Sequence, residues 1–415
     1  MNLDQNHNAP GLSTVPACHV SLQLIPLSIQ REGDSYLVGS LELNRFYQIP
    51  EIGVQVIRLL QQGLSLPEVK EKLGAGEVDI DDFASTLIEI GLAYPGPLRE
   101  PVNTPLIASA KWFRIAGRIG RIIFSLPSAC LCMLVVLYAA ICLVKVPQAW
   151  PSLRVFYFPG HLTASLLILL VLRFFMVLLH ELGHMLAAAR LNIPSYLGVG
   201  TRLWTIVIEA DLTGVLSQPR RKRYLPLLAG MLTDVFIMSI LLITVVHLLN
   251  AHAGPFVVQL LQASIMQTLL VLFWQLNIFL RTDFYYVICT ILAYPDMDRD
   301  ARIYIQALLH RFSRGHIGTR LESDPIPDRL NVVRLFSLIW LVGRLASIYV
   351  LLAVAVPTLL LYARDSWGAF MAASSKALPY DFLFFALLST VLFVSGIWMW
   401  LSRIKSRRLR LSDQQ

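Results

Sequence analysis

The chain has 415 residues, of which 56% are hydrophobic and only 15% are charged, and its formal net charge is +8. An ordinary soluble domain is about 25% charged, so this composition excludes a typical soluble globular protein. Apolar runs long enough to cross a bilayer recur along the sequence, which predicts an α-helical polytopic membrane protein. The first 20 residues are polar, so no secretory signal peptide is expected, and the five cysteines form no CxxC pair.

The amino-terminal part predicts a small soluble domain. Residues 1–24 are expected to be disordered, and an α+β domain is expected over residues 25–100. The apolar pattern of 34–49 indicates two strands around a turn, and three helices are predicted over 51–63, 65–74 and 79–92. Ser65 and Glu68 have the spacing of a capping box at the start of the second helix. A β-hairpin with three helices predicts a compact winged-helix-like domain.

This domain carries a family resemblance. The stretches FYQIPEIGVQVIRLLQQGLSLPEVKEKL (46–73) and FASTLIEIGLAYPG (83–96) resemble PqqD-like domains, the leader-peptide recognition elements of ribosomal-peptide maturation systems. The resemblance covers about residues 25–97 and implies that a peptide binds by adding a strand to the small sheet. The alternative is a winged helix with another role, such as nucleic-acid binding. This stretch is more acidic than basic, which argues against DNA.

Six apolar segments predict six membrane crossings. Basic residues gather on one side of these crossings, which predicts that this side is cytoplasmic. We therefore expect a multi-pass protein of the bacterial inner membrane with both termini in the cytoplasm, and some attraction of the basic side to anionic lipid. The crossings are expected at about 122–144, 162–190, 224–250, 255–280, 335–362 and 382–402, with a basic linker at 101–121, a cytoplasmic loop at 301–334 and a basic tail at 403–415.

The motif HELGH (180–184) lies inside the second predicted crossing. On a helix, His180 and His184 are about one turn apart, so both imidazoles can face one metal ion. Glu181 lies about 100° around the helix, where it can hold a zinc-bound water and accept its proton. This spacing predicts one Zn²⁺ per chain. The alternative is a pair of histidines hydrogen-bonded within a helix bundle.

The depth of the motif follows from the predicted topology. The second crossing runs inward, so HELGH is expected near the cytoplasmic leaflet. Arg173 precedes His180 by seven residues and therefore lies on nearly the same face of the helix. We expect Arg173 either to pair with an acid, to contact a substrate carbonyl, or to be a structural charge in a water-filled cavity.

A catalytic zinc ion keeps three protein ligands and one open position. Asp283 follows the fourth crossing, which also runs inward and ends on the same side as HELGH. The stretch NIFLRTDFYY (277–286) resembles the NPLLxxDGYY segment of site-2-protease-type intramembrane zinc peptidases, in their bacterial peptide-zinc-metalloprotease branch. The resemblance implies Asp283 as the third ligand and Asn277 as a polar group near the substrate or oxyanion. Ile278 and Phe284 depart from the family, which has Pro and Gly there.

Two further stretches fit this resemblance, which covers about residues 120–300. LLAGMLTDVF (227–236) resembles the family's AGPxxN segment, in which Gly230 would permit close approach to the zinc helix. Asp234 is expected to hold a histidine N–H, to pair with Arg173, or to be the third ligand in place of Asp283. Residues 195–216 indicate strands. The resemblance implies a hairpin near the site that can hold an extended substrate, and the alternative is a simple connecting hairpin.

These features predict a zinc-dependent intramembrane endopeptidase with its core at 122–300 and two additional transmembrane helices at 335–402. Glu181 would act as general base and then acid on a small ribosomally made precursor peptide. The expected partners are this peptide, membrane lipid and a neighbouring modification enzyme or exporter, with no nucleic acid. The alternatives are regulated cleavage of a membrane-anchored regulator, a non-catalytic immunity or peptide-binding protein, and a transporter. Glu181 argues against a purely structural metal site, and no internal repeat supports a transporter.

Overall fold

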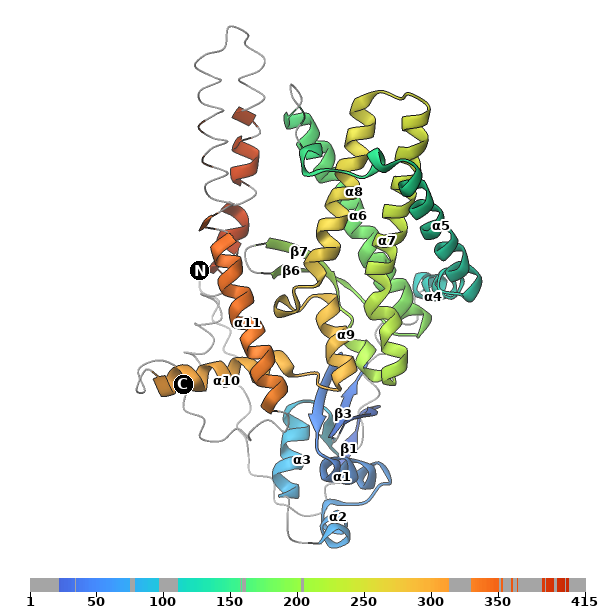
Figure 1. Cartoon of the computed structure of the whole chain (residues 1–415). Coiled ribbons are helices and arrows are strands. Elements are labelled where there is room, and N and C mark those ends of the chain that lie inside the picture. Colours follow the sequence, from blue (N-terminus) through green and yellow to red (C-terminus); the bar gives the residue numbers. More distant parts are fainter. Residues whose placement is uncertain are drawn as a thin grey trace, which may run out of the picture. The chain divides into compact units, whose positions relative to one another are not determined.

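A computed structural model describes residues 22–33, 35–74, 79–96, 111–156, 158, 162–202, 205–312 and 330–350, with short pieces between 352 and 402 (Figure 1). The chain forms two compact units, Met1–Pro105 and Leu106–Gln415, which we call unit 1 and unit 2 and describe separately. The expected disordered segment, apart from its last residues 22–24, and the basic tail at 403–415 lie outside the described residues.

Unit 1 contains two small antiparallel sheets. β1 (Leu22–Leu24) pairs with β5 (Ala93–Pro95), which joins the two ends of the unit. The second sheet has the order β2 (Ser28–Glu32), β3 (Ser35–Ser40), β4 (Arg45–Ile49). The expected hairpin is β3–β4, whereas β1, β2 and β5 were not expected. These three strands are only three to five residues long, and β2 has the polar sequence SIQRE, so alternation of apolar residues could not reveal them.

Three helices complete unit 1, as the sequence predicted. They are α1 (Glu51–Gln61), α2 (Leu66–Leu73) and α3 (Ile80–Glu89). Their apolar faces share one core with the strands, in which Val56, Ile57 and Leu87 are almost completely buried. In α3, Ala84 and Leu87 are buried on the inner face, whereas Ile88 is 39% exposed.

Side chains fix the starts of two of these helices. The Glu68 carboxylate accepts the backbone N–H of Ser65 at 2.7 Å and its hydroxyl at 2.8 Å, so the predicted contact between these residues is present. At the start of α3, the Asp79 carboxylate accepts the N–H groups of Asp81 and Asp82, each at 3.1 Å.

Unit 2 contains, among the described residues, five helices long and apolar enough to cross a membrane. Many of their large apolar side chains are exposed, which fits a polytopic membrane protein whose helices face lipid. The sixth expected crossing, at 382–402, is described in pieces, all of them helical, and includes the shorter apolar helix Ala386–Met399. The five helices are α5 (Leu126–Lys145), α6 (Leu162–Arg190), α7 (Arg220–Asn250), α8 (Pro255–Gln275) and α11 (Leu330–Val350).

Helix α7 lies at the centre of this bundle and contacts α5, α6, α8 and α9 (Figure 1). Its contact with α6 is close because Gly183 has no side chain. A Cβ atom at Gly183 would lie 2.4 Å from the hydroxyl oxygen of Thr233 and 3.1 Å from the carbonyl oxygen of Ala229. Small residues of this kind allow membrane helices to approach closely, so α6 and α7 form a tightly packed pair.

The described part of the expected basic linker at 101–121 is helical and belongs to α4 (Lys111–Ile123). The first crossing accordingly begins later than expected, at Leu126. Ser125 accepts the backbone N–H of Ser128 and caps the new helix. Pro127 lies in the first turn of α5, where its missing N–H leaves no hydrogen bond unmade. The break between α4 and α5 therefore has a local cause.

Two other boundaries also differ from expectation. The fourth crossing was expected to reach residue 280, but α8 ends at Gln275, whose carbonyl accepts the Thr282 hydroxyl at 2.6 Å in place of a helical N–H. The chain then passes through the 3₁₀ helix η4 (Ile278–Leu280) into α9 (Asp283–Leu292). The expected loop at 301–334 is helical at both ends. α10 (Met297–Phe312) covers the start of this range, and α11 starts at Leu330.

The remaining connections are short. The 3₁₀ helices η1 (Pro147–Ala149) and η2 (Leu153–Phe156) join α5 to α6. The expected strands between α6 and α7 are β6 (Leu197–Arg202) and β7 (Thr205–Ala210), an antiparallel hairpin followed by η3 (Thr213–Ser217). β7 lies against α6, which brings this hairpin to the helix that carries HELGH.

Candidate metal centre

Three side chains from distant parts of the sequence meet inside unit 2. His180 and His184 come from α6, and Asp283 is the first residue of α9. The Asp283 Oδ2 atom lies 3.0 Å from His180 Nε2 and 3.2 Å from His184 Nε2, and the two Nε2 atoms are 3.1 Å apart. Both histidines are buried and Asp283 is half-buried. These three residues could hold a metal ion.

The orientation of each imidazole ring is fixed by a hydrogen bond at its Nδ1 atom. The Nδ1–H of His184 donates to the carbonyl oxygen of Pro226 at 2.7 Å. A carbonyl oxygen can only accept, so a neutral His184 presents the lone pair of Nε2 on the other side. The Nδ1 of His180 faces the Asp234 carboxylate at 2.8 Å, which acts in the same way. Hydrogen bonds of this kind are the usual support of metal-binding histidines.

This arrangement leaves three acceptor atoms facing one another. With Nδ1 protonated on both rings, the two Nε2 lone pairs and the Asp283 oxygen point at one region without a proton between them. Buried acceptors rarely remain in such contact without a donor, and a cation satisfies all three. In a tetrahedral site with bonds of about 2.0–2.1 Å, ligand atoms lie roughly 3.3 Å apart. The observed separations of 3.0–3.2 Å therefore suit one small divalent ion.

Gly230 of α7 makes room for the two rings. A Cβ atom there would lie 2.3 Å from His184 Nε2 and 2.5 Å from His180 Nε2. Any other residue at this position would push the two Nε2 atoms away. The close approach expected at Gly230 is therefore present, and it is made by the imidazole rings of α6.

Asp283 is held by a residue that the sequence patterns did not single out. The Gln275 side-chain oxygen accepts the backbone N–H of Asp283 at 3.2 Å, and the Gln275 carbonyl accepts the Thr282 hydroxyl. Gln275 is buried at the end of α8. Its position as a polar residue at the end of a long apolar run is the sequence feature that could have pointed to this role. Arg281 adopts a left-handed conformation, with φ of 55°, and turns the chain into α9. Phe284 follows as an ordinary helical residue and does not displace Asp283.

Glu181 adjoins the histidines and links α6 to the hairpin. Its side chain is buried, and one carboxylate oxygen accepts the backbone N–H of Ala210 at 2.7 Å. Ala210 is the last residue of β7. A carboxylate has several acceptor positions, so this single bond orients the group and leaves capacity for a water molecule.

The other predicted site residues lie around this centre or apart from it. Asp234 is buried behind His180 and is not one of the three residues that face the common point. Arg173 is half-buried on α6 and takes part in none of the ion pairs found among the described residues. The Asn277 amide donates to the Trp274 carbonyl at 3.0 Å, so in this structure it binds the end of α8.

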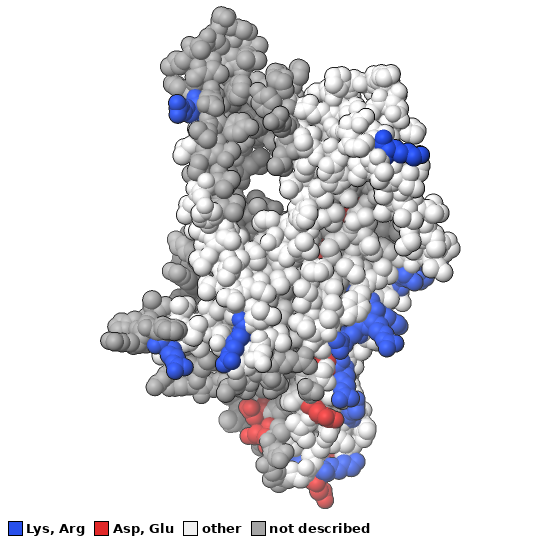
Figure 2. All heavy atoms as spheres, in the orientation of Figure 1, with Lys and Arg blue, Asp and Glu red and all other residues white. Residues whose placement is uncertain are grey.

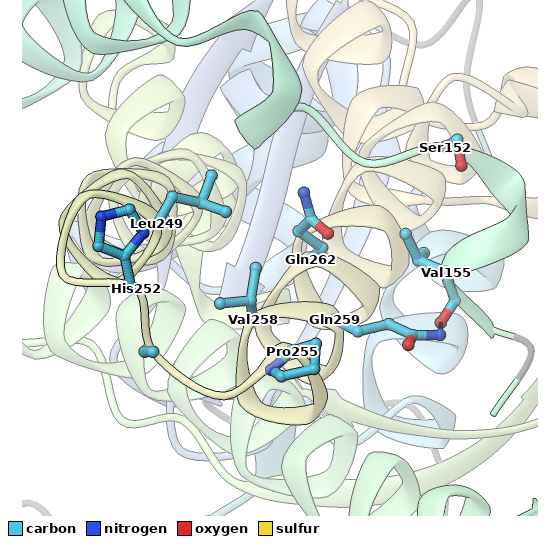
Figure 3. A pocket seen from close by; sticks show the side chains of 9 residues that line it. Ser152, Val155, Leu249, His252, Pro255, Val258, Gln259 and Gln262 are labelled. Carbon is cyan, nitrogen blue, oxygen red and sulfur yellow. Dashed lines mark hydrogen bonds between the residues drawn. The ribbon is translucent and has the colours of Figure 1, made fainter.

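A separate cavity of about 630 Å³ lies where the end of α7 meets the start of α8 (Figure 3). None of the three candidate ligands lines it. The amide of Gln259 donates to the Val155 carbonyl, and that of Gln262 to the Gln148 carbonyl, so these polar groups bind protein. This cavity is distinct from the metal centre, and its lining comprises Ser152, Val155, Leu249, His252, Ala253, Pro255, Val258, Gln259 and Gln262.

Comparison of the chain with protein-family models, curated proteins and solved structures finds no match. The chemical interpretation of the centre therefore depends on the ligand geometry and on the sequence motifs.

Proposed function

We propose that this protein is a zinc-dependent intramembrane endopeptidase. The observation that carries the proposal is the meeting of His180, His184 and Asp283 at one point, with Glu181 next to His180 on the same helix. Two histidines and one carboxylate are a ligand set of catalytic zinc hydrolases, in which the fourth position is open to water. The resemblance of residues 120–300 to site-2-protease-type peptidases supports the same reading.

In this proposal each residue of the centre has a separate role in peptide hydrolysis. Zn²⁺ bound by the three ligands supplies Lewis acidity to the scissile carbonyl and to the attacking water. Glu181 accepts a proton from the attacking water while the water oxygen bonds to the carbonyl carbon. Glu181 then gives this proton to the amine nitrogen as the C–N bond breaks. The Ala210 N–H holds the Glu181 carboxylate in place throughout. Asp234 and the Pro226 carbonyl keep both imidazoles in the tautomer that presents Nε2.

The hairpin β6–β7 offers a platform for the substrate backbone. Its strand β7 is joined to Glu181 through Ala210, and β6 and β7 are each an edge strand of this two-stranded sheet. A peptide that adds to a sheet is extended, which exposes its amides to attack, whereas a helix hides them. We infer that the substrate is bound in extended form next to this hairpin.

The substrate we propose is a small ribosomally made precursor peptide, whose leader is held by unit 1. Support comes from the PqqD-like pattern of this unit and from its three-stranded sheet, in which β2 and β4 are the outer strands. The basic residues of α4 and those at Arg220–Arg223 favour a cytoplasmic location for the end of α6 that carries Arg190. Unit 1 precedes α4 in the chain, so we propose that it is cytoplasmic as well. We accordingly place the protein in a bacterial inner membrane.

The decisive experiment follows the size of a precursor peptide encoded beside this protein, in cells that contain either the wild type or the Glu181→Gln variant. Glutamine can still accept the Ala210 N–H but cannot act as a base, so processing should fall by about 10²-fold or more while zinc remains bound. Glu71→Gln, which changes an exposed carboxylate of α2, is the matched control and should process normally. Equal processing by Glu181→Gln and wild type would refute the peptidase proposal.

Leader recognition needs its own measurement. The full-length Glu181→Gln variant, which leaves the peptide intact, should bind the precursor more tightly than the same peptide without its leader. Equal affinity for both peptides would refute the recognition role of unit 1 but would leave the hydrolase proposal unaffected.

A further inference from the structure

Helix α4 presents three separate faces. Phe113, Gly117 and Gly120 are buried, and this face lies against α6. At 100° per residue, the exposed apolar residues form a second face about 100° wide. The third face is basic and contains no acid. The apolar face consists of Trp112, Ile115, Ile119, Ile122 and Ile123, and the basic face of Lys111, Arg114, Arg118 and Arg121, all of them exposed.

The packing of α4 on α6 is fixed by backbone contacts. A Cβ atom at Gly120 would lie 2.1 Å from the Leu186 carbonyl oxygen, and one at Gly117 would lie 3.0 Å from that of Ala189. The Arg190 guanidinium donates to the Phe124 carbonyl at 2.6 Å. α4 is therefore seated on the last turns of the helix that carries the two histidines, and it cannot turn its other faces inward.

The position of α4 along the bundle follows from its neighbours. Only Phe124 and Ser125 separate α4 from α5, a helix that can span a membrane, and α6 ends at the same level with Arg190. α4 thus lies where the spans leave the hydrocarbon core. Figure 2 shows that Lys and Arg gather around this lower end of unit 2, whereas the described surface of the long helices above it carries few charges.

Among the residues that the structure describes, no ion pair neutralises the charge of α4. Its four cations take part in none of the ion pairs found among the described residues. An aromatic and aliphatic face beside a purely basic face is the pattern of a helix that lies in a membrane interface with anionic lipid. The apolar side chains then reach the acyl chains, and the cations meet the lipid phosphates.

We propose that α4 is an interfacial helix that binds the headgroups of anionic phospholipids. Each cation near such a surface contributes about five-fold to the association, as expected from roughly 1 kcal/mol per basic residue. This proposal depends on the membrane location of unit 2 and is independent of the peptidase activity.

The test uses the full-length protein in phosphatidylcholine vesicles that contain a small amount of spin-labelled lipid. The wild type should immobilise spin-labelled phosphatidylglycerol in preference to spin-labelled phosphatidylcholine. The triple variant Arg114→Gln, Arg118→Gln, Arg121→Gln should lose about five-fold or more of this preference. A triple variant of exposed cations in unit 1 (Arg45→Gln, Arg58→Gln, Lys72→Gln) removes the same charge and should retain the preference for phosphatidylglycerol. Undiminished preference in the α4 variant would overturn the proposal.

A second measurement examines the apolar face. Lipids brominated close to the headgroup should quench the part of the tryptophan fluorescence that is lost in Trp112→Phe, because Trp112 would lie among the upper acyl carbons. If this part of the signal is not quenched, the face is covered by protein rather than lipid, and the proposal is wrong.

Discussion

The Asp234 carboxylate lies 2.8 Å from Nδ1 of His180, on the side of the ring opposite the nitrogen that faces Asp283. The two acids thus contact the same imidazole but from opposite sides. Asp234 is positioned to fix the tautomer of His180, and Asp283 is positioned to share a metal ion with it. This difference in placement separates the roles of two acids that looked similar in the sequence.

Removing either acid should weaken zinc binding, but to different extents. Asp283→Asn eliminates a charged ligand, so the zinc content of the purified protein should fall to background after competition with a chelator. Asp234→Asn should retain a site that is about 10- to 100-fold weaker, because only the support of His180 changes. Asp82→Asn, which alters an exposed carboxylate on α3, serves as control. Normal zinc in Asp283→Asn together with none in Asp234→Asn would reverse the two roles.

Helix α11 should support the metal centre through Phe279. A Cβ atom at Gly343 would lie 2.3 Å from the Phe279 ring, and Phe279 precedes Asp283 by four residues. Gly343→Ala should therefore move the Asp283 segment and weaken zinc binding, with an overpacking cost of about 1–3 kcal/mol. Gly254→Ala places its methyl group in open space and is the matched control. Zinc affinity can be measured by competition titration, and identical affinities for both variants would show that α11 does not position Asp283.

The contact between α4 and α6 predicts a graded pair of variants. Gly120→Ala would bring a methyl carbon to 2.1 Å from the Leu186 carbonyl oxygen, whereas Gly117→Ala would bring one to 3.0 Å from Ala189. Gly120→Ala should destabilise the protein by about 1–3 kcal/mol, and Gly117→Ala should cost less. Thermal unfolding in detergent provides the comparison. The opposite order, or no loss in either variant, would contradict this packing.

The capping contact of α2 predicts a pH dependence in unit 1. The hydrogen bonds from Ser65 hold the pKa of Glu68 below its ordinary value. A lowered pKa in the folded state means that the carboxylate stabilises α2 fully above the unfolded value of about 4.3, and that this stabilisation is lost as pH falls through the folded pKa.

Hydrogen exchange of the α2 amides in the full-length protein measures this effect. In the wild type, protection should fall on acidification below about pH 4 relative to Glu68→Gln at each pH, since glutamine does not titrate. Parallel protection of the two proteins across this range would exclude a role for the Glu68 charge.

Much of the local structure was predictable because it depends on neighbouring residues. The apolar runs located the long helices, and the spacing of Ser65 and Glu68 located the start of α2. Predictions failed where a boundary depends on a few polar contacts. The hydrophobic run of the fourth crossing continues past Gln275, but the helix ends there and the Thr282 hydroxyl satisfies its last carbonyl.

The sequence by itself determined that two histidines and a glutamate share one helix in an apolar chain, since the period of an α-helix places residues 180, 181 and 184 without reference to the rest of the molecule. Only the tertiary structure decided which acid faces the histidines. Asp234 lies within the apolar run of α7 and Asp283 follows the apolar run of α8, and their distances to His180 depend on how α7 and α9 pack against α6. The Pro226 carbonyl and the Ala210 N–H were likewise beyond sequence analysis, because every residue carries such a backbone group and only the fold selects the ones that meet a side chain.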